Sequence, residues 1–76
     1  MKLVKVDWMD SAACDGWVGV TYAEEFNPSK CVTVGWVVKK TREYITTVGS
    51  KSDSINYSQL MAIPRSCIIS IKELEE

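Results

Sequence analysis

The fold is decided between residues 31 and 71, where three apolar, β-branched runs read Cys31-Val-Thr-Val-Gly-Trp-Val-Val38, Tyr44-Ile-Thr-Thr-Val48, and Leu60-Met-Ala-Ile63 with Cys67-Ile-Ile-Ser-Ile71. Short polar breaks separate the runs, and residues of this type favour strands over helices. The runs predict an all-β fold: a small, highly curved antiparallel β-barrel of the SH3-like or Sm-like kind. We expect about five strands and at most one short helical turn.

The first strand is expected upstream, where Val4, Val6 and Trp8 alternate with Lys5 and Asp7. Alternation with a period of two is typical of a strand with one buried face. A chain of 76 residues buries only roughly 60–65 % of its unfolded surface. We therefore expect a single domain over residues 1–76, with a small core that self-association would stabilise.

The run from 31 to 38 has two faces, because successive side chains of a strand point in opposite directions. The expected core face holds Val32, Val34, Trp36 and Val38, and the other face holds Cys31, Thr33, Gly35 and Val37. A glycine inside a strand marks a bend or a close backbone approach. Gly35 is therefore predicted to lie at a corner of the barrel.

Four shorter segments have weaker signals. Residues 17–22 are expected to pair briefly as a strand, and residues 23–26 to form one helical turn that ends before Pro28. Residues 49–56 form a polar loop, predicted to be mobile. Residues 63–66 contain a proline between two expected strands and predict a tight turn. A single helical turn is the alternative at this place.

Composition excludes several classes of protein. The net charge is −1, from nine Lys and Arg against ten Asp and Glu, which argues against a general nucleic-acid binder. No apolar run approaches the roughly 20 residues of a membrane span, and the charged N-terminal segment does not resemble a signal peptide. The three cysteines are odd in number and lack zinc-site spacing. A cytoplasmic protein without membrane contact is expected.

Catalysis is not expected, because the chain has no histidine, the side chain most often used for proton transfer near neutral pH. Asp7, Asp10 and Asp15 offer an alternative, a carboxylate cluster for a divalent cation. Solvent exposure and turn formation explain the same residues more simply. A nucleophilic cysteine needs a base or positive surroundings that lower its pKa, whereas the sequence neighbour of Cys14 is the acidic Asp15. We expect no catalytic residue, metal or cofactor.

Basic residues gather near the expected second hairpin, and they have two interpretations. The group consists of Lys39, Lys40 and Arg42, with Lys51 and Arg65 as possible neighbours. Charges at a hairpin tip keep the turn solvated and discourage aggregation of edge strands. Alternatively, the group binds phosphates, as in a small barrel for single-stranded nucleic acid.

Trp17 differs from the other tryptophans, because it follows a flexible Asp-Gly pair outside the strand runs. A tryptophan there is either a lid on the barrel or a surface anchor for a partner. At a junction between subunits, Trp8, Asp10, Ser11 and Trp17 would wall a pocket for a planar, nucleotide-type ligand.

Four segments resemble, in this order and spacing, small proteins encoded in many bacteriophage genomes and prophages. They are Trp8-Met-Asp-Ser11, Gly16-Trp17, Cys31-Val-Thr-Val-Gly35 and Ile63-Pro-Arg-Ser-Cys-Ile68. The resemblance covers most of the chain and departs from the pattern between Val18 and Phe26. It implies a viral protein in the cytoplasm of a bacterial host, where such products bind host proteins or interfere with defence. It implies no catalytic residue.

Together, these observations favour a non-catalytic, oligomeric binding protein that captures a host factor or a nucleotide-type signalling molecule. The alternative is a small nucleic-acid-binding barrel that uses Lys39, Lys40 and Arg42. A carboxylate-based enzyme ranks third.

Overall fold

The computed structural model describes residues 1–53 and 55–76. In this part of the chain one antiparallel sheet has the strand order β4-β3-β2-β1-β5. Its strands are β1 (Leu3–Asp10), β2 (Ser29–Lys40), β3 (Tyr44–Lys51), β4 (Tyr57–Pro64) and β5 (Ile68–Glu73). A short helix, α1 (Val20–Glu24), lies between β1 and β2, and a 3-10 turn, η1 (Arg65–Cys67), joins β4 to β5. The predicted all-β class is confirmed, with two short helical segments where one was expected.

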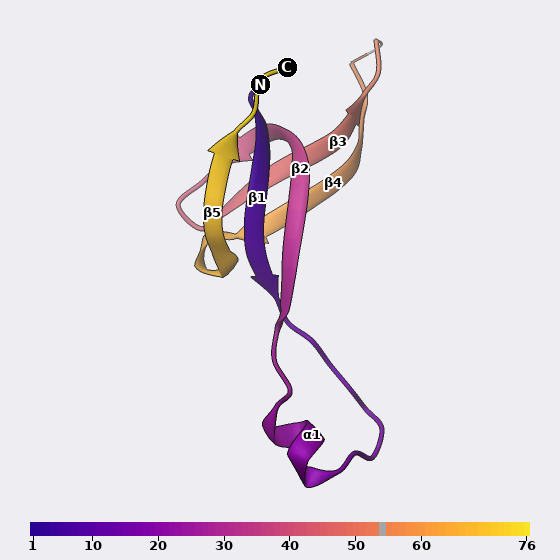
Figure 1. Ribbon diagram of the computed structural model, residues 1–76. Coiled ribbons are helices and arrows are strands. Elements are labelled where there is room, and N and C mark those ends of the chain that lie inside the picture. The colour runs from indigo at the N-terminus through magenta and orange to yellow at the C-terminus, as the bar shows by residue number, and fades with distance from the viewer. Residues whose placement is uncertain (54) are drawn as a thin grey trace.

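The sheet is bent but open. Figure 1 shows β3 and β4 crossing behind β5, β1 and β2, so that one sheet supplies both layers around the core. The two edge strands, β4 and β5, do not pair with each other in the described residues. The predicted antiparallel strands are therefore present, but they form an open sheet and not a closed barrel. Pro64 ends β4 without an amide to donate, and the chain turns through η1 so that β5 pairs with β1.

The core lies between the two layers of the bent sheet. Its buried cluster consists of Val4, Val6, Ile45 and Ile63. Three partly buried side chains pack against this cluster, namely Trp8, Val37 and Ile68. The alternation of Val4, Val6 and Trp8 thus predicted the buried face of β1 correctly.

The buried face of β2 is the reverse of the predicted one. Val4 pairs with Gly35 and Val6 pairs with Thr33, and side chains that lie opposite each other in antiparallel strands share a face. Gly35 is buried, whereas Val32 and Val34 remain 60 % and 54 % exposed. The close approach predicted at Gly35 is confirmed, since a Cβ there would lie 2.7 Å from the carbonyl oxygen of Val48.

Trp36 is partly exposed and lies on the outer face of β2, so its predicted burial is wrong. The Lys51 ammonium lies 4.2 Å from the centre of its ring. Its Nε1 donates a hydrogen bond of 2.8 Å to Oε1 of Glu76. The C-terminal segment is also held by a hydrogen bond of 2.9 Å from the Leu74 amide to the Leu3 carbonyl.

Several element boundaries differ from prediction. Residues 17–19 form no strand, and α1 begins at Val20. The polar residues 49–51 belong to β3, because Ser50 and Lys51 pair with β4. The Ser52 amide donates a hydrogen bond of 2.9 Å to the Asn56 carbonyl. Residue 54 of the loop predicted to be mobile lies outside the described residues. The tight turn predicted at 63–66 is confirmed by η1.

Candidate functional site

The connection between β1 and β2, residues 11–28, forms an arm that extends away from the sheet. Figure 1 shows it leaving the ends of β1 and β2, with α1 far from both chain termini. Every residue of the arm is exposed, and α1 buries none of its side chains. Because Asp10 pairs with Ser29 at the base, the two strands carry the arm as a hairpin carries its loop.

The arm is held by local contacts. The rings of Tyr22 and Phe26, which are one helical turn apart, have centroids 5.9 Å from each other. The Asn27 side chain donates to the Glu25 carbonyl at 2.8 Å, where α1 has ended. Pro28 then directs the chain into the extended β2. Apolar side chains that face solvent from this arm are Trp17, Val18, Val20, Tyr22 and Phe26.

Charge divides the arm from the sheet. The arm contains Asp15, Glu24 and Glu25 but no lysine or arginine, so its formal charge is −3. The rest of the chain keeps all nine basic residues and seven of the ten acidic ones, which leaves +2 (nine minus seven). The arm is therefore an apolar and acidic projection on a basic body.

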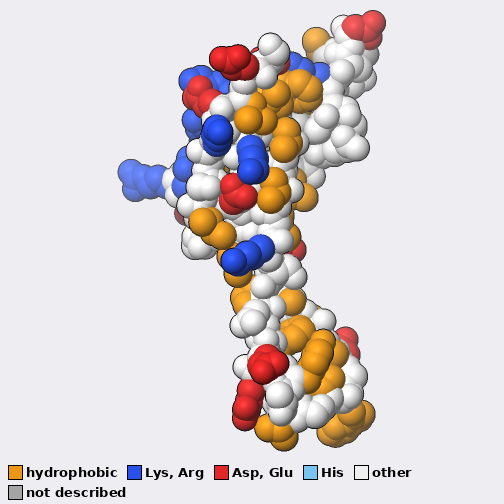
Figure 2. Space-filling view, viewed as in Figure 1, with side chains coloured by type: hydrophobic (Ala, Val, Ile, Leu, Met, Phe, Trp, Pro, Cys, Tyr) orange, Lys and Arg blue, Asp and Glu red, His pale blue; other side chains and the backbone are white. Residues whose placement is uncertain are grey.

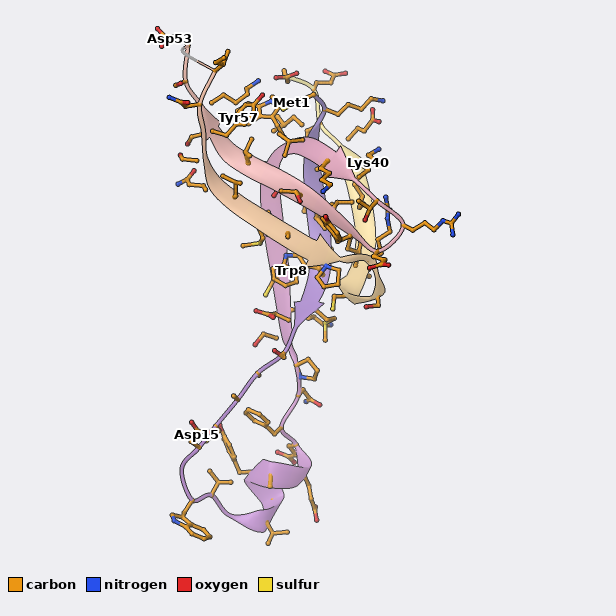
Figure 3. The ribbon with its side chains drawn as sticks, turned by 180° about the vertical axis from the view of Figure 1, so that it is seen from behind. Met1, Trp8, Asp15, Lys40, Asp53 and Tyr57 are labelled. Atoms are coloured by element: carbon orange, nitrogen blue, oxygen red, sulfur yellow. The ribbon has the colours of Figure 1, made fainter. Side chains whose placement is uncertain are left out.

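The four residues of the predicted ligand pocket do not come together within one chain. Trp8 lies on the inner face of β1, where its Nε1 donates a hydrogen bond of 2.9 Å to Thr33 Oγ1. Asp10 and Ser11 are exposed at the base of the arm, and Trp17 is fully exposed further out. Figure 3 shows Trp8 on the sheet and the arm residue Asp15 far from it.

Arg65, one of the two possible neighbours, contacts the turn between β2 and β3, which follows Lys39 and Lys40 and contains Arg42. Arg65 Nε donates to the Thr41 carbonyl at 2.8 Å, and the Arg65 amide donates to the Glu43 carbonyl at 2.8 Å. The Lys39 ammonium lies 5.3 Å from the ring centre of Tyr44. Lys40 and Arg42 are exposed. We call Lys39, Lys40, Arg42 and Arg65 the basic hairpin. Lys51 is not a neighbour, because it lies at the opposite end of β3.

The carboxylates considered for a metal site lie in different parts of the molecule. Asp7 on β1 accepts a hydrogen bond of 3.2 Å from Ser70 Oγ on β5. Asp10 ends β1, and Asp15 lies in the arm. In the described residues no three potential ligands of the His, Cys, Asp or Glu type gather around one point.

Sequence reasoning missed two features. A shallow depression of about 340 Å³ is lined by Glu43, Tyr44, Ala62 and Pro64, and no sequence pattern indicated it. The second is the outer surface of β1, β2 and β5, the lysine–valine face. It is formed by Lys5, Lys30, Val32, Val34 and Lys72 and also contains Asp7, which lies opposite Val32. Figure 2 shows basic and hydrophobic side chains intermixed over this side of the sheet.

Comparisons with family models, with curated proteins and with solved structures found no significant match. Within the described residues, no helix combines the length and apolarity needed to cross a membrane.

Proposed function

We propose that the chain is a non-catalytic binding protein that captures a protein partner through its arm. The observation that carries the proposal is Trp17, which is fully exposed on a segment that contributes nothing to the core. Exposed apolar side chains gathered in one region are typical of interaction sites. Tryptophan is among the residues that most often supply binding energy when an interface buries them.

The composition of the arm specifies the chemistry of its partner. Trp17 and Val20 need an apolar recess, since 75 % of the Val20 side chain is exposed. Asp15, Glu24 and Glu25 need basic groups around that recess, because charges at the rim of an interface are arranged to be complementary. The expected partner surface is therefore apolar at its centre and basic at its edge.

The resemblance to phage-encoded proteins extends the proposal. It supports a bacterial host protein as the captured factor, with host takeover or counter-defence as the outcome and the host cytoplasm as the location. The strand order, with a 3-10 turn before the last strand, supports an SH3-like or Sm-like sheet as the scaffold.

A capture experiment with matched variants tests the proposal. Tagged wild-type protein, Trp17→Ala and Leu60→Ala are incubated with bacterial lysate, and the recovered proteins and any heat-released small molecules are measured by mass spectrometry. Leu60 is the control, because it is an exposed apolar residue on β4, outside the arm. We expect Trp17→Ala to reduce recovery of the partner by at least about tenfold and Leu60→Ala to leave it unchanged. Equal recovery by all three, or release of a nucleotide without a protein, would contradict capture by the arm.

A second candidate function is favoured by the position of Arg65. Its contacts with Thr41 and Glu43 bring a fourth cation to the end of the sheet that carries Lys39, Lys40 and Arg42. Four cations at one end of the sheet would suit the phosphates of single-stranded nucleic acid. Four phosphate contacts predict that the logarithm of the binding constant falls with the logarithm of salt concentration with a slope of about −3. Fluorescence titration with a labelled oligonucleotide at several salt concentrations measures this slope, and a slope near zero rejects this candidate.

A further inference from the structure

The sequence of β2 is that of a strand covered on both faces, although the single chain covers only one. Strands buried on both sides read as continuous apolar runs, whereas half-exposed strands alternate apolar and polar residues. The run from 31 to 38 is almost continuously apolar, while the alternating residues 4–8 of β1 follow the half-exposed pattern. Val32 and Val34 nevertheless face solvent.

Like charges also meet on this face. Lys5 lies directly opposite Lys72 in the pairing of β1 with β5, and like charges in that position destabilise a sheet. The carboxylate beside them, Asp7, accepts a hydrogen bond from Ser70. The one ion pair found in the described residues joins Lys2 to Glu73, so it neutralises neither of these lysines.

From these two features we infer that the arm of a second copy of this chain covers the lysine–valine face. This inference rests on the proposed function, since it takes the arm as the docking element, and it names one partner of the arm. The arm and the face are complementary in hydrophobicity and in charge. The apolar side chains of Trp17 and Val20 would cover Val32 and Val34. The carboxylates of Glu24 and Glu25 would approach the ammonium groups of Lys5 and Lys72.

The shape of the molecule favours contact between copies over contact within one chain. The chain extends over 51 × 23 × 23 Å, and Figure 1 shows the arm pointing away from the sheet that carries it. An arm directed outward reaches the face of a neighbour. Because arm and face are different surfaces, the assembly closes only as a reciprocal two-fold dimer or as a ring.

Exchange of charge between the two surfaces tests the inference. The arm variant is Glu24→Lys/Glu25→Lys and the face variant is Lys5→Glu/Lys72→Glu, which retains two like charges opposite each other. The control is Lys39→Glu/Arg42→Glu on the basic hairpin. Association of each protein, and of the arm and face variants mixed in equal amounts, is measured by sedimentation velocity and native mass spectrometry up to about 100 µM.

We expect wild-type and control proteins to associate, and the arm and face variants to associate at least about tenfold more weakly when alone. Mixing these two variants should restore association as a complex that contains both. Association of wild-type protein that neither variant weakens, or a mixture that remains monomeric although both variants are folded, would overturn the inference.

A measurement on wild-type protein covers the case in which a variant fails to fold. Lysine acetylation is followed by mass spectrometry at protein concentrations below and above the association midpoint. Lys5 and Lys72 should become several-fold less reactive in the complex, whereas Lys39 should not change. Wild-type protein that remains monomeric over this concentration range overturns the inference. It does so whether or not the lysine–valine face binds an oligonucleotide. If the wild-type protein is monomeric but Trp17→Ala abolishes capture of a partner from lysate, the proposed function stands and only the contact between copies is rejected. If the arm variants change neither capture from lysate nor self-association, the proposed function and the contact between copies are both rejected.

Discussion

Gly35 lies beside the point where β2 changes from pairing with β1 to pairing with β3. No side chain larger than hydrogen fits its inner side, because a Cβ would lie 2.7 Å from the Val48 carbonyl oxygen and 3.4 Å from the Thr47 Cβ. Val48 and Thr47 are both buried, so this part of β3 has little room to move. The close approach of β2 and β3 at this residue therefore depends on the absence of a side chain.

Substitution of Gly35→Ala is expected to lower the free energy of unfolding by about 1–3 kcal/mol, the usual cost of overpacking a core. The clash is with backbone atoms, which cannot rotate away as a flexible side chain can. Urea denaturation followed by tryptophan fluorescence measures the change.

The matched control for Gly35→Ala is Gly16→Ala in the arm. A Cβ at Gly16 would meet nothing within 4 Å, so we expect its effect to lie within about 0.5 kcal/mol of zero. Equal destabilisation by both substitutions would show that the approach of β2 to β3 is not what excludes a side chain at Gly35.

Individual residues show how far pattern alone predicts the buried face. In β1, Lys5 and Asp7 separate the apolar residues, so alternation predicted the inner face correctly. In β2, both faces are apolar, and alternation gave no basis for choosing between them. Pairing of Gly35 with Val4 determines the choice, and that contact joins distant parts of the sequence.

At the scale of elements, strands were predicted better than their ends. The apolar runs predicted β2, β3, β4 and β5, but β3 continues through the polar residues Ser50 and Lys51 because β4 supplies partners for them. The arm was not recognised as one unit. Its sequence predicted a short strand at 17–22 and one helical turn at 23–26. No described strand lies beside the arm to supply pairing, and the helix α1 begins earlier than predicted, at Val20.

The arm and the sheet are expected to be independent elements. Replacing residues 11–28 with Asn-Gly joins Asp10 to Ser29 through a two-residue turn of the type that suits a hairpin. The core is unaffected, and the loop becomes roughly ninefold shorter, so the free energy of unfolding should rise by about 1–2 kcal/mol. Thermal denaturation monitored by circular dichroism measures the change.

A large loss of stability in the shortened chain would mean that the arm supports the sheet. A second chain in which residues 11–28 become a Gly-Ser linker of equal length serves as its control. That linker should leave stability near the wild-type value, because it keeps the length of the loop and removes only its side chains.

For the whole molecule, the arm dominates the shape. The radius of gyration is 15.8 Å, whereas a compact domain of this length has about 11 Å. Sequence composition predicted one small domain and gave no indication of this extension. The open form of the sheet was likewise not evident from the sequence. Whether β4 and β5 pair depends on the path that the chain takes through η1, and short runs of residues do not determine that path.

The two ends of the chain are joined by an exposed ion pair, Lys2 to Glu73, with Nζ 2.8 Å from Oε1. The hydrogen bond and charge of Lys2 lower the pKa of Glu73 below its ordinary value of 4.5. The same contacts with Glu73 raise the pKa of Lys2 above 10.5. A carboxyl whose pKa falls on folding stabilises the native state above its unfolded pKa, and this contribution is lost as the pH falls through the folded value.

Lys2→Met is therefore expected to be slightly less stable than wild type near neutral pH. The difference should shrink as the pH falls below 4.5 and disappear once the pH lies below the lowered pKa of Glu73 in the folded protein, where this carboxyl is protonated in both proteins. It should also shrink in about 1 M salt, because exposed charges are screened. Urea midpoints at several pH values measure the difference. A difference that persists in acid would show that Lys2 acts through its aliphatic chain and not through its charge.

The position of β1 between β2 and β5 has a consequence for the order of folding. Its pairing with β5 joins residues as far as 69 positions apart, Val4 with Glu73, and closure of such distant contacts slows folding. While the chain is being synthesised, β1 and β2 can pair as soon as the arm has emerged, but one edge of β1 remains open until β5 follows. The newly made protein thus passes through a stage in which β1, with its apolar residues Val4, Val6 and Trp8, is paired on one edge only. A chaperone would have most apolar surface to bind at this stage.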